Sequence, residues 1–303
     1  MPPPSIFGIV DVTFARGARA RADAPPDLII EVPHGATRTA DYTALAARLT
    51  SPLPDRLVDF FHVNTDAGAP ELAIAIARRF VVDEPARSVA VLRCRIPRTF
   101  IDCNRRIDAT PEEFRAGKVT PGVMPWIATD GDRALLRGLY DRYVAAVVDA
   151  AALLPADGAM LLLHSYAPRD VDVEVDADIV AKLHRAYRPD VEPTWPLRPP
   201  IDVIGKAVDG TDHAPPAVVD ALRAALEPLG LAVANSATYP LHPSTLAWAR
   251  VHERPGRAVC IEVRRDLLAE PFEPFAEMAI AHANVDRLAP AFVAALRRFW
   301  SRS

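Results

Sequence analysis

Short, nearly continuous apolar runs recur along the chain and predict buried strands. They are separated by stretches in which apolar residues repeat at helical spacing, a pattern typical of helices that pack on a sheet. The apolar runs cover residues 27–32, 89–96, 159–163, 201–205, 231–235 and 258–263, and a further β-rich stretch covers 99–103. Strands that alternate with helices favour an α/β fold whose mainly parallel sheet is covered by helices on both faces.

Helical spacing predicts three internal helices and a terminal helical segment. The clearest internal helix ends at Pro155, because proline cannot continue a helix. We expect the terminal segment to be a long helix, or a helix pair, that is broken near Pro290. The helical stretches cover residues 69–80, 132–154, 215–229 and 273–300.

Length and composition fit one large domain. The chain has 303 residues, of which 50% are hydrophobic, and this is enough to build one substantial core. We therefore expect a single domain over residues 1–303. We expect 1–26 to be an irregular N-terminal segment, 189–200 to be a proline-rich loop, and 273–303 to form the C-terminal helical segment.

Charge and cysteine use limit the partners and the compartment. The formal net charge is −4 and the arginines are scattered, so nucleic acid is not expected as a partner. No apolar run approaches the roughly 18 residues of a membrane span, and the first residues lack the basic and apolar regions of a signal peptide. The three cysteines form no CxxC pair, which fits a reducing, cytoplasmic setting. The oligomeric state is left open.

Three apolar runs end on side chains suited to metal chemistry, namely His34, His164 and Glu262. Ligands of open α/β sheets bind at the carboxyl ends of the strands. Two histidines and a carboxylate at one such edge can form a hydrolytic zinc site. Each residue also has a structural alternative, since a histidine at a strand end can be hydrogen-bonded in the core and Glu262 can pair with Arg264 or Arg265.

Two polar segments add candidates. Asp66 precedes a predicted helix and is either a third metal ligand or a helix cap. The segment 98–106 combines several arginines with the amide of Asn104, a combination suited to gripping a carboxylate. Its alternative is a surface strand end with solvated arginines. Asp102 in this segment either orients an arginine or caps a turn.

Taken in order, these motifs resemble the N-formylglutamate amidohydrolase family. The order is Pro–His–Gly at 33–35, Thr–Asp at 65–66, Arg–x–x–Ile–Asp–x–Asn–Arg at 98–105, His–Ser at 164–165 and Glu–x–x–Arg at 262–265. The resemblance covers roughly residues 27–270, and the segment 98–105 is its most specific part.

One loop departs from the family pattern. The family usually has a Gly–Gly–Tyr-type stretch before its last catalytic strand, whereas this chain reads Asn–Ser–Ala–Thr–Tyr–Pro–Leu–His over 235–242. Because this loop shapes the substrate pocket in the family, the acyl group and the amino acid of the substrate are left open. Tyr239 and His242 either contact substrate or belong to a proline-bounded surface loop.

The same order is more distantly similar to that of the zinc carboxypeptidases. Their Asn–Arg pair, His–Ser–Tyr segment and Glu–x–Arg strand have counterparts at 104–105, 164–166 and 262–264. Their first metal segment is His–x–x–Glu, but Thr37 stands where that glutamate would be. The resemblance implies Asp66 as the substitute ligand, with Glu71 as the other option. It also implies a single α/β domain with a zinc-carboxypeptidase-like (phosphorylase/hydrolase-like) fold.

These resemblances imply a zinc-dependent amidohydrolase that cleaves the amide bond of a small N-acyl amino acid similar to N-formylglutamate. Arg98 or Arg38 would stabilise the oxyanion. Another divalent metal also suits a His–His–carboxylate set. The implied site residues are His34, Asp66 and His164 for the metal, Glu262 and Arg98 for catalysis, and Arg38, Asn104, Arg105 and Tyr239 for the substrate.

Two other functions fit the same residues. One is a carboxypeptidase-like metallopeptidase that trims short or cell-wall peptides. The other is a non-catalytic binding protein that retains the fold. Turnover of N-formylglutamate against a dipeptide panel separates the first alternative, and metal analysis of the purified protein separates the second.

Overall fold

Seven strands form a mixed, mainly parallel sheet at the centre of the protein. The structure is a computed structural model and describes residues 3–301. The strand order is β1-β3-β2-β4-β7-β5-β6, in which β1 pairs antiparallel with β3, β5 pairs antiparallel with β7, and the other neighbours are parallel. The strands are β1 (Val10–Arg16), β2 (Leu28–Val32), β3 (Ser88–Cys94), β4 (Ala159–Tyr166), β5 (Ile201–Val203), β6 (Val233–Asn235) and β7 (Ala258–Arg264).

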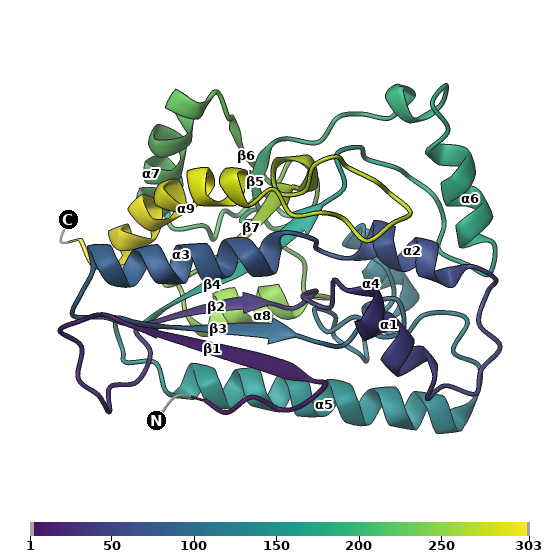
Figure 1. The fold of residues 1–303 in the computed structure, drawn as a ribbon, viewed down its shortest axis with the longest axis horizontal. Coiled ribbons are helices and arrows are strands. Elements are labelled where there is room, and N and C mark those ends of the chain that lie inside the picture. The colour runs from purple at the N-terminus through teal and green to yellow at the C-terminus, as the bar shows by residue number, and fades with distance from the viewer. Residues whose placement is uncertain (1–2, 302–303) are drawn as a thin grey trace.

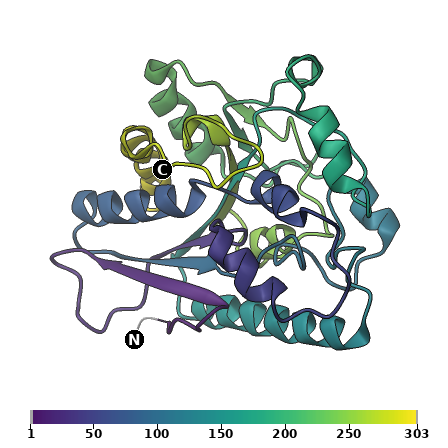
Figure 2. The same ribbon diagram turned by 45° about the vertical axis from the view of Figure 1, so that its right-hand side comes forward.

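Helices cover both faces of this sheet (Figures 1 and 2). Core residues of α3, α7 and α9 pack on one face, and those of α5 and α8 pack on the other. The fold is therefore the single α/β domain that the alternation of strands and helices predicts. The helices are α1 (Thr39–Ala46), α2 (Leu57–Asn64), α3 (Ala69–Asp83), α4 (Pro111–Ala116), α5 (Asp130–Ala152), α6 (Ile179–Ala186), α7 (Pro216–Leu226), α8 (Leu246–Glu253) and α9 (His282–Leu296).

The alternation of side chains along each central strand decides which face carries the polar residues. In β4, Leu161 and Leu163 belong to the core cluster with α3 and α9, whereas Leu162 belongs to the cluster with α5 and α8. Because successive side chains point to opposite faces, His164 faces the α5 and α8 side. Glu262 faces the same side, since it pairs in register with His164 between β4 and β7.

Most predicted elements are confirmed, and three expectations are wrong. Residues 1–26 are not irregular throughout, because β1 lies within them; its alternating Val10, Val12 and Phe14 are a strand signal that the sequence already contains. The stretch 99–103 is not a strand and forms only an isolated bridge at Ile101. We expected the terminal helix to begin near 273 and to break near Pro290. It begins instead at His282 and runs through Pro290 to Leu296 without a break.

The unbroken α9 has a packing explanation. Pro290 removes one backbone donor, but α9 packs against both α3 and α7, and contacts on both flanks hold the helix together. Five short helices were not anticipated, namely α1, α2, α4, α6 and α8. Short helices carry few turns of periodic signal. Among residues 3–301, no helix is long and apolar enough to cross a membrane.

Candidate metal centre and active site

Tight loops bring His34 and Asp66 to the end of β4, where His164 lies. His34 follows β2, and Asp66 lies in the turn before α3. The Thr65 hydroxyl donates to the Ala36 carbonyl at 2.7 Å, which ties the two loops together. Gly35 allows close packing here, because a Cβ at this position would lie 2.6 Å from Cγ of Arg93. Two loops distant in sequence therefore converge on one strand end.

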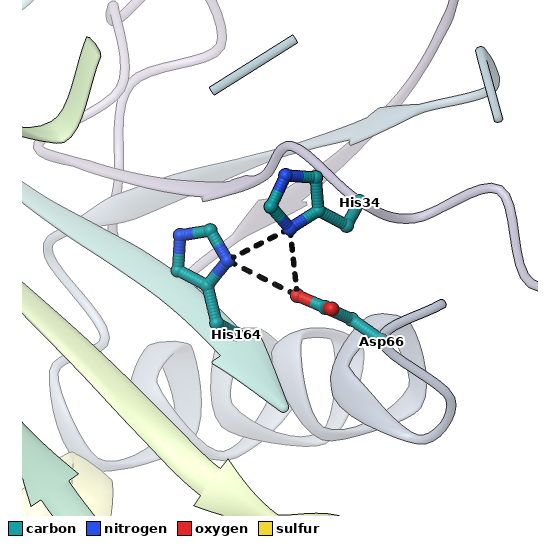
Figure 3. Close-up of side chains that lie close together, drawn as sticks. All are labelled: His34, Asp66 and His164. Atoms are coloured by element: carbon teal, nitrogen blue, oxygen red, sulfur yellow. Dashed lines mark hydrogen bonds and ion pairs between the residues drawn. The ribbon is translucent and has the colours of Figure 1, made fainter. Parts of the chain in front are cut away.

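The three side chains point toward one another (Figure 3). Oδ2 of Asp66 lies 3.2 Å from Nδ1 of His34 and 3.0 Å from Nδ1 of His164, and the two Nδ1 atoms are 3.2 Å apart. A zinc ion with bonds of about 2.0–2.1 Å in tetrahedral geometry separates its ligand atoms by about 3.3 Å. The His34, Asp66 and His164 cluster is almost fully buried and has the spacing of a metal-binding group.

The hydrogen bonds around His34 bear on whether this cluster could hold a cation. Nε2 of His34 lies 2.7 Å from Oδ1 of Asp102, so this nitrogen carries the proton that is donated to the carboxylate. In the neutral ring, Nδ1 then presents a lone pair toward the Asp66 oxygen. Two lone pairs at this distance repel each other unless a positive charge lies between them. A carboxylate behind a histidine is also the usual way of orienting a metal ligand.

Asp102 is the anchor of this arrangement. Its carboxylate also accepts from the Asn104 backbone at 2.8 Å and from Nη2 of Arg98 at 2.9 Å, and Nη2 of Arg105 lies 3.3 Å away. Burial alone would raise the pKa of Asp102, but Arg105, His34 and Arg98 outweigh burial and hold this pKa well below its usual range. Asp102 is therefore an ionised orienting group rather than a simple turn cap.

Glu262 lies beside this cluster in the same cavity. It pairs across the sheet with His164 and lines the same cavity as both histidines. Burial, followed by the nearby Asp66 charge, raises the pKa of Glu262 to about 7 against the opposing effect of His164. Within residues 3–301, Glu262 forms no ion pair. Arg264 pairs with Asp266 instead, and the Oε2 atom of Glu262 has no hydrogen-bond partner.

The segment 98–105 forms another part of the cavity wall and is not a solvated surface. Arg98, Asn104 and Arg105 all line the cavity. The Arg105 side chain is 5% exposed, and its guanidinium donates to the carbonyls of Thr120 and Asn104. The amide of Asn104 is held by the Ala247 backbone, whose N–H donates to Oδ1 at 3.1 Å. These hydrogen bonds fix the side chains of Asn104 and Arg105 in the cavity wall.

Arg38 and Glu71 lie apart from this site. Arg38 caps α1 and pairs with Glu71 at 3.3 Å and with Glu277 at 3.2 Å. Neither Arg38 nor Glu71 is among the residues that line the cavity, and Glu71 is not part of the metal-binding group. Of the loop residues, Tyr239 lines the cavity, whereas His242 pairs with Ser244.

Two residues of this region were not anticipated from the sequence. Asp202 pairs in register with Glu262 between β5 and β7 and accepts the backbone N–H groups of Ala237 and Thr238 at 3.2 and 2.8 Å. It thereby holds the loop that carries Tyr239. An acidic residue inside an apolar run is the same signal that marks Glu262. Arg198 also lines the cavity, and nothing in its proline-rich sequence context indicates this position.

The cavity has room for a small organic molecule. Its volume is about 700 Å³, inside the range of roughly 300–1,000 Å³ that is usual for ligand sites. It combines the two histidines and Glu262 with arginines and with apolar side chains of α2 and α6. A buried carboxyl group, a His–Asp–His cluster that could hold a metal, and cationic donors in one cavity are residue types that metal-assisted hydrolysis uses.

Comparisons with solved structures agree with this fold. An N-formylglutamate amidohydrolase from Ralstonia eutropha JMP134 aligns with a TM-score of 0.59 and 18% identity, over 97% of this chain and 98% of that chain. The gene product Atu2144 from Agrobacterium tumefaciens aligns with a TM-score of 0.51 and 18% identity, over 96% of this chain and 94% of that chain.

A metallo-carboxypeptidase from Burkholderia cenocepacia aligns with a TM-score of only 0.36 and 14% identity, over 96% of this chain and 64% of that chain. A score this low does not establish a shared fold. None of the curated protein sequences compared matches the chain.

The family model described as N-formylglutamate amidohydrolase matches residues 27–269. This range contains every residue of the candidate metal centre together with Glu262 and the segment 98–105. It also covers well over half of the chain. The protein belongs to the N-formylglutamate amidohydrolase family.

Proposed function

We propose that the protein is a zinc-dependent amidohydrolase that cleaves the amide bond of a small N-acyl amino acid similar to N-formylglutamate. The observation that carries this proposal is the buried cluster of His34, Asp66 and His164 with Glu262 beside it in one cavity. Family membership supports the reaction class, and the chemistry of the cluster supports the metal.

Two histidines and one carboxylate are a common catalytic ligand set for zinc and leave one coordination position open. When bound, such a metal supplies Lewis acidity to the scissile carbonyl and increases the acidity of a water molecule beside it. His34 and His164 would provide the nitrogen ligands, and Asp66 would provide the negative charge. Asp102 keeps His34 in the tautomer whose Nδ1 faces the cluster.

Glu262 acts as the general base and then as the general acid. Its carboxylate takes the proton of the attacking water and afterwards delivers a proton to the departing amine. A pKa near 7 suits both roles, because the group gains and loses a proton with little cost at neutral pH.

Cationic groups of the cavity wall bind and orient the substrate. Arg98 lies against the cluster, with Nη1 3.3 Å from Nδ1 of His34, and stabilises the oxyanion that develops on the carbonyl. We prefer Arg98 to Arg38 for this role because Arg98 lines the cavity and Arg38 does not. Asn104 and Arg105 bind the amino-acid carboxylate. Nη1 and Nη2 of Arg105 face the Asn104 carbonyl and Asp102, respectively. Each of these nitrogens has a second N–H group, and two such donors in fixed positions suit a planar carboxylate. Tyr239 contributes to the wall of the substrate site.

The three cysteines agree with a cytoplasmic location. Cys94, Cys103 and Cys260 are free and buried, as expected for a protein of a reducing compartment.

The test combines metal analysis with a substrate screen. Zinc-supplemented protein is expected to hold about one equivalent of metal and to hydrolyse N-formylglutamate faster than any member of a dipeptide panel. The His164→Ala variant loses both metal and turnover, whereas Glu262→Gln keeps the metal and loses most turnover. A Glu262→Gln variant with near wild-type kcat would contradict the general-base role. Metal below about a tenth of an equivalent would favour a non-catalytic binding protein.

A further inference from the structure

Several arginines that the proposed mechanism does not use also line the cavity, and Arg198 is one of them. Arg198 precedes β5 and lines the same cavity as His164 and Glu262. Its side chain is only 11% exposed. A long cationic side chain is rarely buried to this extent unless it has a structural or binding role.

Two tyrosine rings hold the Arg198 guanidinium in place. Its central carbon lies 5.2 Å from the ring centre of Tyr166 and 5.4 Å from that of Tyr239, within the roughly 6 Å range of cation–π contacts. The Tyr166 hydroxyl donates to the Pro199 carbonyl at 2.7 Å, and the Arg198 backbone N–H donates to the Pro168 carbonyl at 2.9 Å. The guanidinium is therefore preorganised, which reduces the entropic cost of binding a ligand.

The hydrogen-bonding capacity of Arg198 is only partly used. Nη2 donates to Oδ1 of Asp170 at 2.7 Å, and the Asp170 side chain is 50% exposed. Nε is buried and has no hydrogen-bond partner within residues 3–301. A buried donor without an acceptor is costly, and an anionic ligand group would supply the acceptor. Because Asp170 is half exposed, its carboxylate can move into solvent while an anionic ligand group takes its place at Arg198.

Arg198 is separate from the two arginines to which the proposed mechanism assigns roles. Arg98 and Arg105 share the buried carboxylate of Asp102, whereas Arg198 pairs with Asp170 on another loop. Arg198 thus offers a place for negative charge that is distinct from the one at Arg105. A substrate with one carboxylate would match one of these two places, and a substrate with two would match both.

We infer that Arg198 determines specificity by binding a second anionic group of the substrate, in exchange for Asp170. The inference rests on the proposed function and narrows its substrate class to N-acyl amino acids with an acidic side chain. Asp170 acts as a counter-ion that neutralises Arg198 in the free protein and that the substrate replaces.

Kinetics with two substrates of nearly equal shape test this role. Zinc-loaded wild-type protein is expected to prefer N-formylglutamate over N-formylglutamine by about tenfold or more in kcat/KM, because hydrogen bonds between charged groups are stronger than those to a neutral amide. Arg198→Gln brings the ratio to within about twofold of one, mainly through a higher KM for N-formylglutamate. Arg198→Lys keeps the charge without the forked donor and gives an intermediate ratio.

Two further variants separate this role from a general structural effect. Asp170→Asn removes the competing carboxylate and lowers the KM for N-formylglutamate. Arg188→Gln serves as the control, because Arg188 is exposed, pairs with Asp190 and does not line the cavity; it keeps the wild-type ratio. A wild-type ratio near one, a wild-type ratio retained in Arg198→Gln, or a higher KM for N-formylglutamate in Asp170→Asn would each overturn the inference.

A binding measurement distinguishes failure of this inference from failure of the proposed function. Calorimetry compares N-acetylglutamate with N-acetylglutamine in the Glu262→Gln background, with and without Arg198→Gln. Tighter binding of N-acetylglutamate that is lost with Arg198→Gln supports the subsite even if no N-acyl amino acid is hydrolysed. Equal binding of the two ligands refutes the subsite even if N-formylglutamate is a good substrate.

Discussion

Replacement of Asp102 by asparagine tests whether one buried carboxylate supports both the metal centre and the cavity wall. Asp102 is fully buried and contacts His34, Asn104, Arg98 and Arg105 at 2.7–3.3 Å. The Asp102→Asn variant keeps the size of the side chain and one carbonyl oxygen. It removes the charge that balances the two guanidinium groups, and it places an amide where His34 needs an acceptor.

The expected effects follow from these contacts. Removing one partner of a buried ion pair costs about 3–5 kcal/mol, and the retained oxygen places Asp102→Asn near the lower value. At about 2 °C per kcal/mol for a chain of this size, the Tm falls by about 6 °C. Loss of the carboxylate behind a metal-binding histidine lowers metal affinity by about 10- to 100-fold.

The pH dependence gives an independent check. The folded pKa of Asp102 lies well below its usual value, so its stabilisation is fully present above the unfolded pKa of about 3.9. This contribution is lost as the pH falls from there through the folded pKa. The difference in unfolding free energy between wild type and Asp102→Asn is therefore constant near neutral pH and shrinks in acid.

The assays are thermal unfolding of the metal-free proteins and competition for zinc with a chelator. Asp172→Asn is the control, because Asp172 is an exposed aspartate at the rim of the same cavity, and it should change neither quantity. If Asp102→Asn unfolded within about 1 °C of wild type and bound zinc within twofold of it, the assigned roles of Asp102 in stability and metal binding would be wrong.

Further perturbations test other parts of the structure. Arg105→Ala is expected to raise the KM for N-formylglutamate at least tenfold with a smaller change in kcat, and an unchanged KM would exclude the clamp. Asp202→Asn loosens the loop that carries Tyr239, so the KM rises severalfold while the zinc content by elemental analysis stays at wild-type level. Chelation of the metal is expected to lower the Tm, since zinc at 100 times its Kd adds about 2.7 kcal/mol of stability; an unchanged Tm would argue against a specific site. Phe292→Ala is expected to cost about 3–5 kcal/mol in denaturant unfolding, because Phe292 is fully buried in α9, whereas Val82→Ala at a position 69% exposed should have little effect.

The local pattern of the sequence was sufficient for the central strands and the long helices. Continuous apolar runs must be buried on both faces, so β2, β4 and β7 could be recognised without tertiary information. The same runs mark His34, His164 and Glu262 as strand-end residues. The pattern failed for α9, because the effect of Pro290 depends on the helices that pack beside it. It also failed for the short helices, whose formation depends on packing more than on periodicity.

Only the tertiary structure shows that similar candidate residues lie in different places. Asp66 and Glu71 are both acidic residues near the start of α3, but the Thr65 contact turns Asp66 toward the histidines, whereas Glu71 faces Arg38. Arg98 lies in the cavity, whereas Arg38 does not. No periodicity distinguishes such residues, because the distinction depends on loop conformation.

The sequence by itself determined the α/β alternation, the strand-end positions of three site residues and the motif order of the family. Tertiary structure alone decided the strand order, the convergence of two loops around the cluster of His34, Asp66 and His164, and the positions of Asp202 beside Glu262 and of Arg198 in the cavity wall. Hydrophobic periodicity is a local property that every short segment carries, whereas the distances among His34, Asp66, Asp102 and His164 arise from segments that are 32 to 130 residues apart. These distances are set by how the whole sheet and its loops pack together.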